Sequence, residues 1–263
     1  MKIWLDGKLV EQEEAKTSVF DHGTLYGDGI FEGIRFYNRR VFRLEDHMDP
    51  LFNCAHYLLL DMPYSKEELS KAVCETAAAS GLDDGYIRLV VTRGIGNLGL
   101  NPFNCKRSCV YIIADKISLY DPAVYENGLS LITSSIRRNR PDTICPQVKS
   151  LNYLNNILAK VEAVRQGAAE ALMLNDQGNV AECTWDNIFI VKDGTVYTPP
   201  VTDGALDGIT RRVVLEICRE QQIPAEEKTM NRFTVTCADE CFLTGTAAEC
   251  VPVTKLDSYE LGS

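Results

Sequence analysis

Hydrophobic and polar positions in the first half of the chain predict short strands and one helix. The Asp6-Gly7 pair separates two short apolar runs, which is the pattern of a tight β-hairpin. Residues 66–80 are rich in strong helix formers, and we expect Ser65 to cap the start of this helix and Gly81 to end it. The predicted strands are residues 2–5, 8–10, 29–37, 41–44, 86–92 and 109–114.

The second half of the chain follows a polar stretch, residues 116–128, whose composition and Pro122 indicate a domain boundary. Two helices are predicted beyond it, at residues 152–166 and 210–221. Helical spacing in the first of them is shown by Leu154, Ile157, Leu158, Val161 and Val164. The predicted strands are residues 129–133, 171–174, 187–191, 196–198 and 240–244.

Strands and helices are mixed in both halves, so we expect an α/β (α+β) fold. The expected domain order is an N-terminal α/β domain at 1–118, a linker at 119–128 and a C-terminal domain at 129–263.

Composition narrows the classes of function. The chain has 263 residues, 45% apolar and 24% charged, which is typical of a globular protein. A formal net charge of −10 disfavours nucleic acid and anionic membrane surfaces as partners. No apolar run approaches the roughly 20 residues that span a bilayer, and the N-terminus lacks a secretory pattern. The ten cysteines form no C-x-x-C pair and there are three histidines, so we expect reduced, mostly buried thiols in a cytoplasmic protein without a metal site.

Lys149 is the first candidate for chemistry. It closely follows Pro146 and precedes the apolar helix predicted at residues 152–166. In most proteins a lysine at such a place is a solvated surface charge, whereas a desolvated lysine amine becomes a nucleophile and a Schiff-base partner. Tyr153, four residues later, offers a phenol that would hydrogen-bond a cofactor oxygen.

Three further segments offer charge or anion-binding backbone. Glu182 stands among apolar and small residues before a strand, where a carboxylate would keep a pyridine nitrogen protonated; alone it would be interpreted as an edge-strand glutamate facing water. Gly208-Ile209-Thr210-Arg211 opens a helix whose free N–H groups suit a phosphate. Residues 244–249, with small side chains and two hydroxyls, form a second candidate phosphate cradle. Each pattern alone is weak, because Gly-x-Thr at a helix start is usually only a cap.

Together these segments resemble the class IV (fold type IV) aminotransferases, which depend on pyridoxal 5′-phosphate (PLP). The resemblance runs in order over nearly the whole chain and is greatest to the branched-chain amino acid aminotransferases. It implies the two-domain, D-amino-acid-aminotransferase-like fold. The motifs are Asp21-His22-Gly23-x-x-Tyr26-Gly27-Asp28-Gly29-x-Phe31-Glu32-Gly33-Ile34-Arg35, Lys149-x-x-Asn152-Tyr153, Ala181-Glu182-x-x-x-Asp186-Asn187-Ile188-Phe189, Gly208-Ile209-Thr210-Arg211 and Thr244-Gly245-Thr246-Ala247-Ala248-Glu249.

The resemblance implies a role for each site residue. Lys149 would hold PLP as a Schiff base and then carry the proton between substrate Cα and the cofactor. Tyr153 would bond the cofactor phenolate and Glu182 its pyridine nitrogen. The phosphate would be held by Ile209, Thr210 and Thr246. The substrate pocket would include Tyr26, Phe31, Arg35, Tyr86, Arg88 and Ala247.

Substrate choice within the family follows from the first domain. The aromatic residues of the implied pocket suit an aliphatic side chain, which favours leucine, isoleucine and valine with 2-oxoglutarate as the amino acceptor. D-Amino-acid aminotransferases carry an Arg-x-His pair soon after Thr-Arg-Gly, and residues 92–102 of this chain have none. A D-specific aminotransferase or an aminodeoxychorismate lyase is the alternative. A homodimer is expected, because the family builds its active site at a subunit contact.

The chain departs from the family at three places. The family's His-x-x-Arg-Leu motif, whose arginine grips the phosphate, has Pro50 in the arginine's position. Such a contact is worth on the order of 1.5–3 kcal/mol, so we expect weaker PLP binding; proline inside a helix is also unfavourable unless Asp49 caps a helix restarted there. Trp185 is larger than the residue usual at this position, which the resemblance places close to the cofactor, and we expect the family's last helix to be absent. These departures favour a third alternative, a cofactor-poor, non-catalytic member. The basic residues 137–140 are expected to form a solvated loop.

Overall fold

The computed structural model describes residues 1–262, which fold into two compact units. Unit 1 consists of residues 1–117 together with Val148–Asn152, and unit 2 consists of residues 118–147 and the chain from Tyr153 onward. Both units combine strands and helices, which confirms the predicted mixed α/β class.

Unit 1 is built on a six-stranded sheet in the order β2-β1-β6-β5-β3-β4, in which all neighbours are antiparallel. The predicted hairpin is present, with its turn at Asp6-Gly7 in the positive-φ region. The strand predicted at residues 41–44 is shorter and begins one residue earlier, because it consists of Arg40 and Val41 only and Leu44 already begins a helix. The strands are β1 (Lys2–Leu5), β2 (Lys8–Glu11), β3 (Gly29–Tyr37), β4 (Arg40–Val41), β5 (Gly85–Thr92) and β6 (Cys109–Asp115).

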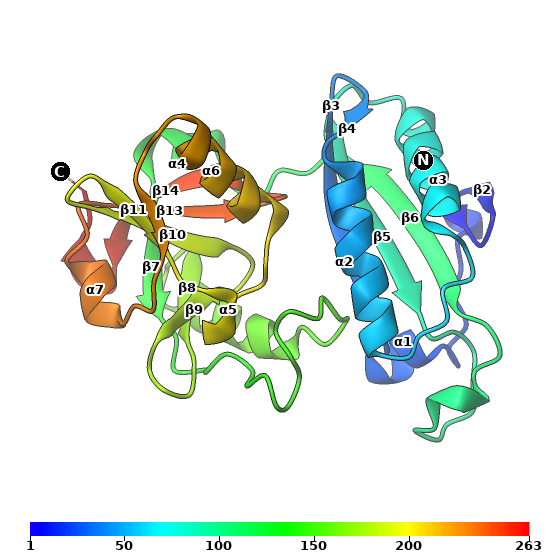
Figure 1. The fold of residues 1–263 in the computed structure, drawn as a ribbon. Helices are drawn as coiled ribbons and strands as arrows, with labels where there is room; N and C mark the ends of the chain where they lie inside the picture. Colours follow the sequence, from blue (N-terminus) through cyan, green and yellow to red (C-terminus); the bar gives the residue numbers. More distant parts are fainter. Residues whose placement is uncertain (263) are drawn as a thin grey trace. The chain divides into compact units, whose positions relative to one another are not determined.

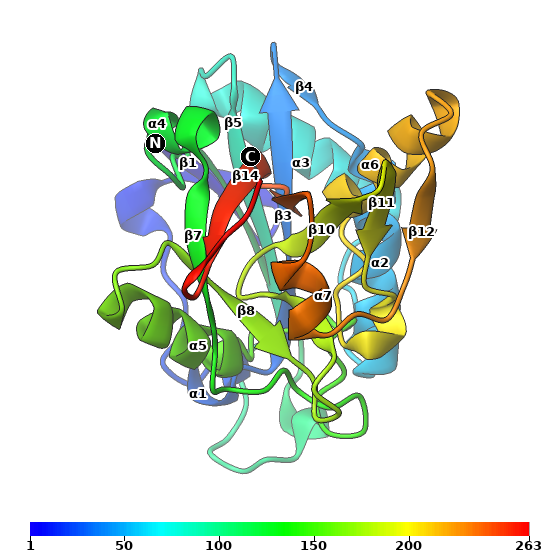
Figure 2. The same cartoon turned by 90° about the vertical axis from the view of Figure 1, so that its left-hand side faces the viewer.

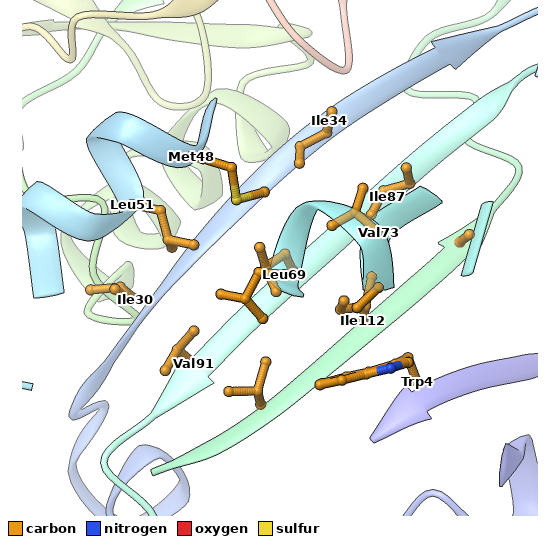
Figure 3. Close-up of a cluster of buried hydrophobic side chains, with 14 of the residues drawn as sticks. Trp4, Ile30, Ile34, Met48, Leu51, Leu69, Val73, Ile87, Val91 and Ile112 are labelled. Atoms are coloured by element: carbon orange, nitrogen blue, oxygen red, sulfur yellow. The ribbon is translucent and has the colours of Figure 1, made fainter. Parts of the chain in front are cut away.

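Two helices cover one face of this sheet (Figure 1). The predicted helix is α3 (Lys66–Ser80), whose N-cap Ser65 forms a reciprocal capping box with Glu68, while Gly81 ends it at φ 72°. The other is α2 (Leu44–Tyr57), and the two pack on the sheet through the apolar core of Figure 3. The remaining helical segments are α1 (His22–Tyr26), η1 (Gln12–Glu14) and η2 (Pro102–Asn104).

Pro50 lies inside α2 without interrupting it. The condition under which proline would cost less, a helix restarted at Pro50 with Asp49 as its cap, is therefore not met. The Asp49 carboxylate instead accepts a hydrogen bond from Lys66 Nζ at 2.5 Å. Proline at this position leaves the Asp46 carbonyl without its usual N–H donor four residues on, which costs helix stability.

Residues 148–152 extend the sheet of unit 1 beside β3. The Phe31 N–H donates to the Lys149 carbonyl at 3.0 Å, and the Leu151 N–H donates to the Gly29 carbonyl at 2.9 Å. Ile30 and Ser150 form an antiparallel bridge. Lys149 is therefore fixed on an edge segment hydrogen-bonded to a central part of the unit.

Unit 2 contains a nine-stranded sheet in the order β12-β11-β10-β13-β14-β7-β8-β9, with β15 paired to β14. Most neighbours are antiparallel, but β11 and β12 are parallel, and β7 runs parallel to both β14 and β8. Strands β7 and β14 lie side by side in Figure 2. The strands are β7 (Leu129–Thr133), β8 (Glu170–Leu174), β9 (Val180–Cys183), β10 (Asn187–Lys192), β11 (Thr195–Thr198), β12 (Ala225–Glu227), β13 (Glu240–Gly245), β14 (Glu249–Leu256) and β15 (Tyr259–Glu260).

The helical segments of unit 2 include both predicted helices. They are α4 (Pro122–Asn127), α5 (Leu154–Arg165), η3 (Val201–Asp203), α6 (Ile209–Glu220) and α7 (Arg232–Thr236). Residues 119–128, which we expected to be a linker, contain α4, and this helix contacts β14. The buried residues of α5 are Asn156, Ala159 and Ala163. Its apolar stripe is exposed instead, at Leu154, Ile157, Leu158, Val161 and Val164.

Candidate active site

Lys149 is largely shielded from solvent, with 18% of its side chain exposed. Its Nζ lies 3.7 Å from Oε2 of Glu32 and 5.5 Å from the ring centroid of Phe31. Both neighbours come from β3, the strand to which the lysine segment is hydrogen-bonded. Lys149 is therefore not a solvated surface lysine of the kind that most proteins have at such a place.

Glu32 is a buried carboxylate with two cationic or polar neighbours. It lies on the face of β3 that packs against α2, and His47 of that helix donates from Nδ1 to its Oε2 at 2.8 Å. Burial opposes ionisation of Glu32, but the Lys149 ammonium and the His47 hydrogen bond outweigh it, so the pKa of Glu32 lies below its usual value. The carboxylate is thus charged near neutral pH.

Four of the predicted substrate residues lie on the two paired strands β3 and β5. The guanidinium of Arg88 is 4.5 Å from the Phe31 ring centroid and 5.5 Å from that of Tyr86, a geometry suited to cation–π attraction. Arg35 pairs in register with Tyr86. A Cβ added at Gly33 would stand 2.0 Å from the Tyr86 hydroxyl, so only glycine fits beneath this ring. Phe31, Tyr86 and Arg88 therefore form one contact group.

Tyr26 lies apart from that contact group in its own hydrogen bonding. It is the last residue of α1, its hydroxyl donates to the Leu98 carbonyl, and its ring meets His22 edge-on at 5.1 Å. His22 is buried and its Nε2 is 2.9 Å from the Asn97 carbonyl, in agreement with a packed histidine.

Glu182 on β9 is buried among hydrogen-bond donors. Its Oε1 accepts from Arg138 Nε at 2.9 Å, and its Oε2 accepts from the Leu206 N–H at 2.8 Å and from Asn187 Nδ2 at 3.3 Å. Both side chains of the ion pair are 7% exposed. The expectation of a solvated loop at 137–140 is therefore wrong for Arg138. The charge-assisted hydrogen bonds stabilise the negative charge of Glu182 and fix its orientation.

The start of α6 is an open anion-binding terminus. Its N-cap is Gly208, which offers no side chain to the first-turn N–H groups of Ile209 and Thr210. A Cβ at Gly208 would lie 2.3 Å from Oδ1 of Asn187, the residue that also holds Glu182. A residue larger than glycine would collide with Asn187 at the N-cap position, so the helix end has no capping side chain. The contact with Asn187 also keeps this helix end near the buried Glu182 carboxylate.

The turn between β13 and β14 carries the other predicted phosphate residue. Thr246 is half-buried in this tight turn and Ala247 is buried. Thr244, at the end of β13, pairs in register with Asn187 of β10. Its buried hydroxyl has no hydrogen-bond partner within residues 1–262, so a polar ligand group would satisfy it.

Tyr153 and Trp185 meet in unit 2, with ring centroids 5.7 Å apart and an interplanar angle of 68°. Trp185 thus packs edge-on against the tyrosine predicted to bond the cofactor. Next to it, Asp186 is buried, and burial together with the nearby Glu170 raises its pKa to about 7. The Tyr120 hydroxyl donates to Asp186 Oδ2 at 3.3 Å.

A separate cavity of about 400 Å³ lies in unit 1 and is not lined by any predicted site residue. Its polar lining includes Arg93, and this arginine already binds Asp28 through two hydrogen bonds of 3.0 Å. The cavity is therefore not the candidate active site.

The protein family described as "Amino-transferase class IV" matches residues 29–256 of the chain, which include Lys149, Glu182 and the start of α6. The chain belongs to the class IV aminotransferases. It is similar to a Methanocaldococcus jannaschii protein provisionally named a branched-chain-amino-acid aminotransferase, with 50% identity over 98% of this chain and 88% of that protein. No helix within residues 1–262 of this aminotransferase is long and apolar enough to cross a membrane.

Two solved structures extend the comparison. The Escherichia coli branched-chain amino acid aminotransferase superposes with a TM-score of 0.97 at 35% identity, covering 100% of this chain and 88% of the other. A T.th. branched-chain amino acid aminotransferase complexed with N-(5′-phosphopyridoxyl)-L-glutamate gives a TM-score of 0.94 at 38% identity, covering 100% and 87%. The predicted family and its fold are thereby confirmed.

Sequence reasoning gave no role to three residues that contact the predicted site residues directly or through one another. Glu32 stands in a quoted motif and His47 opens the segment that corresponds to His-x-x-Arg-Leu, and a glutamate inside an otherwise apolar strand is a signal of a buried partner. Arg138 sits in a basic run that looks solvated, and nothing in the run distinguishes it from Arg140, which is exposed and pairs with Asp142. Only the tertiary contact with Glu182 reveals it.

Proposed function

We propose that this aminotransferase moves the amino group of leucine, isoleucine or valine to 2-oxoglutarate, with PLP bound covalently to Lys149. The observation that carries the proposal is the buried Glu182, held by Arg138 and by the Leu206 N–H beside an uncapped helix start. The branched-chain names of similar proteins and the phosphopyridoxyl ligand of one of them support the same conclusion.

The residues present fit PLP. An ionised, buried carboxylate suits a protonated pyridine nitrogen, and the N–H groups of Ile209 and Thr210 suit a phosphate. The Thr246 hydroxyl would hydrogen-bond the phosphate. The unsatisfied Thr244 hydroxyl indicates that this end of β13 can bind a further polar group. Tyr153 would hydrogen-bond the ring oxygen of the cofactor.

Bound PLP supplies an electron sink for the negative charge that develops at substrate Cα. Lys149 Nζ accepts the proton from Cα and later returns a proton, acting as general base and then as general acid. Glu182 would hold the pyridine nitrogen of bound PLP in its protonated form, and its own charge would not change. The hydrogen bonds from Arg138 and Asn187 keep its carboxylate in place during these steps.

Substrate preference would follow from the contact group on β3 and β5. Phe31 and Tyr86 present aromatic surface to an aliphatic side chain, and Arg88 sits over both rings, where a substrate carboxylate would find a fixed cation. Ala247, buried in the turn after β13, would leave room for a branched chain.

The test is the visible absorption spectrum with added PLP, before and after borohydride, for wild type and Lys149→Ala. We expect a yellow band that borohydride converts to a stable adduct on Lys149 in the wild type only. Lys116→Ala, which removes an exposed lysine, is the matched control for adventitious labelling and should behave as wild type. A panel of L-leucine, a D-amino acid and aminodeoxychorismate then separates the activities. The proposal fails if saturating PLP gives no band.

We also infer a homodimer in a reducing, cytoplasmic compartment. Two charged residues of α5 are engaged away from its apolar stripe, because Lys160 binds Glu170 and the Ala169 carbonyl while Glu162 binds Ser134 and Ser135. The exposed Arg165 stands at the C-terminal end of the stripe. A second copy of the same stripe is its natural cover. All ten cysteines are free thiols, four of them buried, so the expectation of mostly buried thiols is wrong while their reduced state suits the cytoplasm.

A further inference from the structure

Lys149 lies beside a buried carboxylate, Glu32, whose role the family motifs do not explain. Glu32 Oε2 lies 3.7 Å from Lys149 Nζ and also accepts the 2.8 Å hydrogen bond from His47. Side-chain exposure is 5% for Glu32 and 1% for His47, so water contributes little to solvating the carboxylate. The lysine and the histidine approach the same oxygen atom, which fixes where the negative charge lies.

The position of Glu32 is unfavourable for packing alone. Its neighbours on the same face of β3 are Ile30 and Ile34, which belong to the apolar core shown in Figure 3 together with Met48 of α2. An ionised carboxylate in such surroundings is costly unless a cation or strong donors compensate it. A methylene-rich side chain would fill the same space without that cost, so a use for the charge is indicated.

We propose that Glu32, oriented by His47, is a positioning residue that stabilises the protonated form of Lys149 while that lysine holds the proton taken from substrate Cα. The inference rests on the proposed function. When the Cα–H bond breaks, its electron pair stays with the substrate and its proton becomes the third N–H of Nζ. The new ammonium then faces the Glu32 carboxylate, which keeps its own charge and receives no proton.

Other charged groups of unit 1 near Lys149 act in the opposite direction or at greater range. Arg88 on β5 shares the Phe31 ring with Lys149, at 4.5 Å for the guanidinium and 5.5 Å for the ammonium. Its positive charge disfavours a second cation, so the carboxylate must outweigh it. His47 on α2 acts through Glu32, because its Nδ1–H is directed at the carboxylate. Glu32 also shows a pKa below its usual value despite its burial, in agreement with an opposite charge at close range.

The experiment measures the protonation of Lys149 directly, in the full chain without added PLP. Competitive acetic anhydride labelling, read by mass spectrometry of the Lys149 peptide across a pH series, gives the midpoint at which the amine becomes reactive. Because an opposite charge at 4–6 Å shifts a pKa by about 1–3 units, Glu32→Gln should lower this midpoint by about one pH unit or more. His47→Gln should lower it by less, since the carboxylate remains. Glu45→Gln, an exposed acidic residue at the start of α2, is the control and should leave it unchanged.

A second readout uses the PLP-loaded enzyme. Glu32→Gln should reduce kcat by about tenfold or more, because one pKa unit of lost ammonium stabilisation corresponds to about a factor of ten. KM should change much less, and the isotope effect of Cα-deuterated leucine should rise as proton transfer becomes slower. Glu32→Asp keeps the negative charge and replaces the glutamine variant as the test if that variant does not fold. The labelling midpoint of Lys149 in Glu32→Asp should stay close to that of wild type.

The outcomes separate two failures. If wild type neither forms the borohydride-stable adduct nor transaminates, the proposed function is wrong. If wild type does both and the labelling midpoint of folded Glu32→Gln equals that of wild type, the carboxylate is merely structural and this inference is overturned. A lowered midpoint with a lowered kcat supports it.

Discussion

The buried ion pair between Arg138 and Glu182 leads to a quantitative prediction for stability. The two charges are joined at 2.9 Å, and each side chain is 7% exposed. Replacing Arg138 by methionine keeps most of the buried volume but leaves the carboxylate without its cation. Breaking one side of a buried pair costs about 3–5 kcal/mol, because the remaining charge is uncompensated.

The structure places the expected loss at the lower end of that range. Glu182 would retain the hydrogen bonds from the Leu206 N–H and from Asn187 Nδ2, which continue to stabilise its charge. Arg138 itself loses little else, since its other contact, with Asn156 Oδ1, is long at 3.4 Å. We therefore expect a loss of about 3 kcal/mol, which corresponds to a fall in Tm of roughly 6–12 °C for a domain of this size.

Urea denaturation and thermal melts of the chain without PLP measure this loss. Arg140→Met is the matched control, because its partner Asp142 lies at the same 2.9 Å but both side chains are exposed. An exposed pair contributes about 0–1 kcal/mol. The double variant Arg138→Met/Glu182→Met should regain stability relative to Arg138→Met alone. If Arg138→Met and Arg140→Met differ by less than about 1 kcal/mol, the description of Glu182 as a buried, compensated charge is wrong.

Three further predictions address α2, the buried Asp186 and α5. Pro50→Arg should bind PLP about 10–150-fold more tightly than wild type in a fluorescence titration. Pro50→Ala, which repairs the helix but offers no charge, should gain up to about 3 kcal/mol of stability without that gain in affinity. Equal PLP affinities of Pro50→Arg and wild type would contradict the prediction. Because burial raises the pKa of Asp186 to about 7, the folded state binds a proton that the unfolded state loses near pH 4. Wild-type stability should therefore fall as pH rises from about 4 to 7, and Asp186→Asn should exceed wild type by up to about 4 kcal/mol at pH 8 but not at pH 4, by urea denaturation. Leu158→Asp should shift the protein to a monomer in light scattering, whereas the control Glu126→Lys, on the exposed side of α4, should not. If Leu158→Asp dimerises with the affinity of wild type, the role of α5 in the dimer is refuted.

Local signals were sufficient for much of the fold. The N-cap Ser65, the stop at Gly81 and the Asp6-Gly7 turn each act within a few residues, so the sequence locates α3 to the residue. The first hairpin is located to within one residue, because β2 continues to Glu11. The strand β4 was predicted too long, because the helix that starts at Leu44 has no capping side chain from which its start could be predicted. Its N-cap position is held by Arg43 in a left-handed conformation.

Tertiary contacts decided what the sequence could not. The helical spacing in α5 correctly indicated a helix, but the apolar stripe faces outward because small residues such as Ala159 and Ala163 pack closest to the sheet. Lys149, Glu182 and the start of α6 were found through motifs, whose roles stay predictions until they are measured. Glu32 and Arg138 acquire meaning only through neighbours that are distant in sequence, and no local period reports such contacts.

The edge segment at residues 148–152 has a consequence for how the protein is made. Phe31 and Lys149 are hydrogen-bonded partners although more than a hundred residues separate them, so a ribosome releases β3 long before the segment that completes its edge. Closing so long a loop is slow compared with local helix formation. The step that completes the sheet of unit 1 is therefore the step that delivers the lysine to Glu32. A nascent chain that has not reached Asn152 carries an exposed strand edge, and it acquires its reactive amine at the same moment that it loses this aggregation hazard.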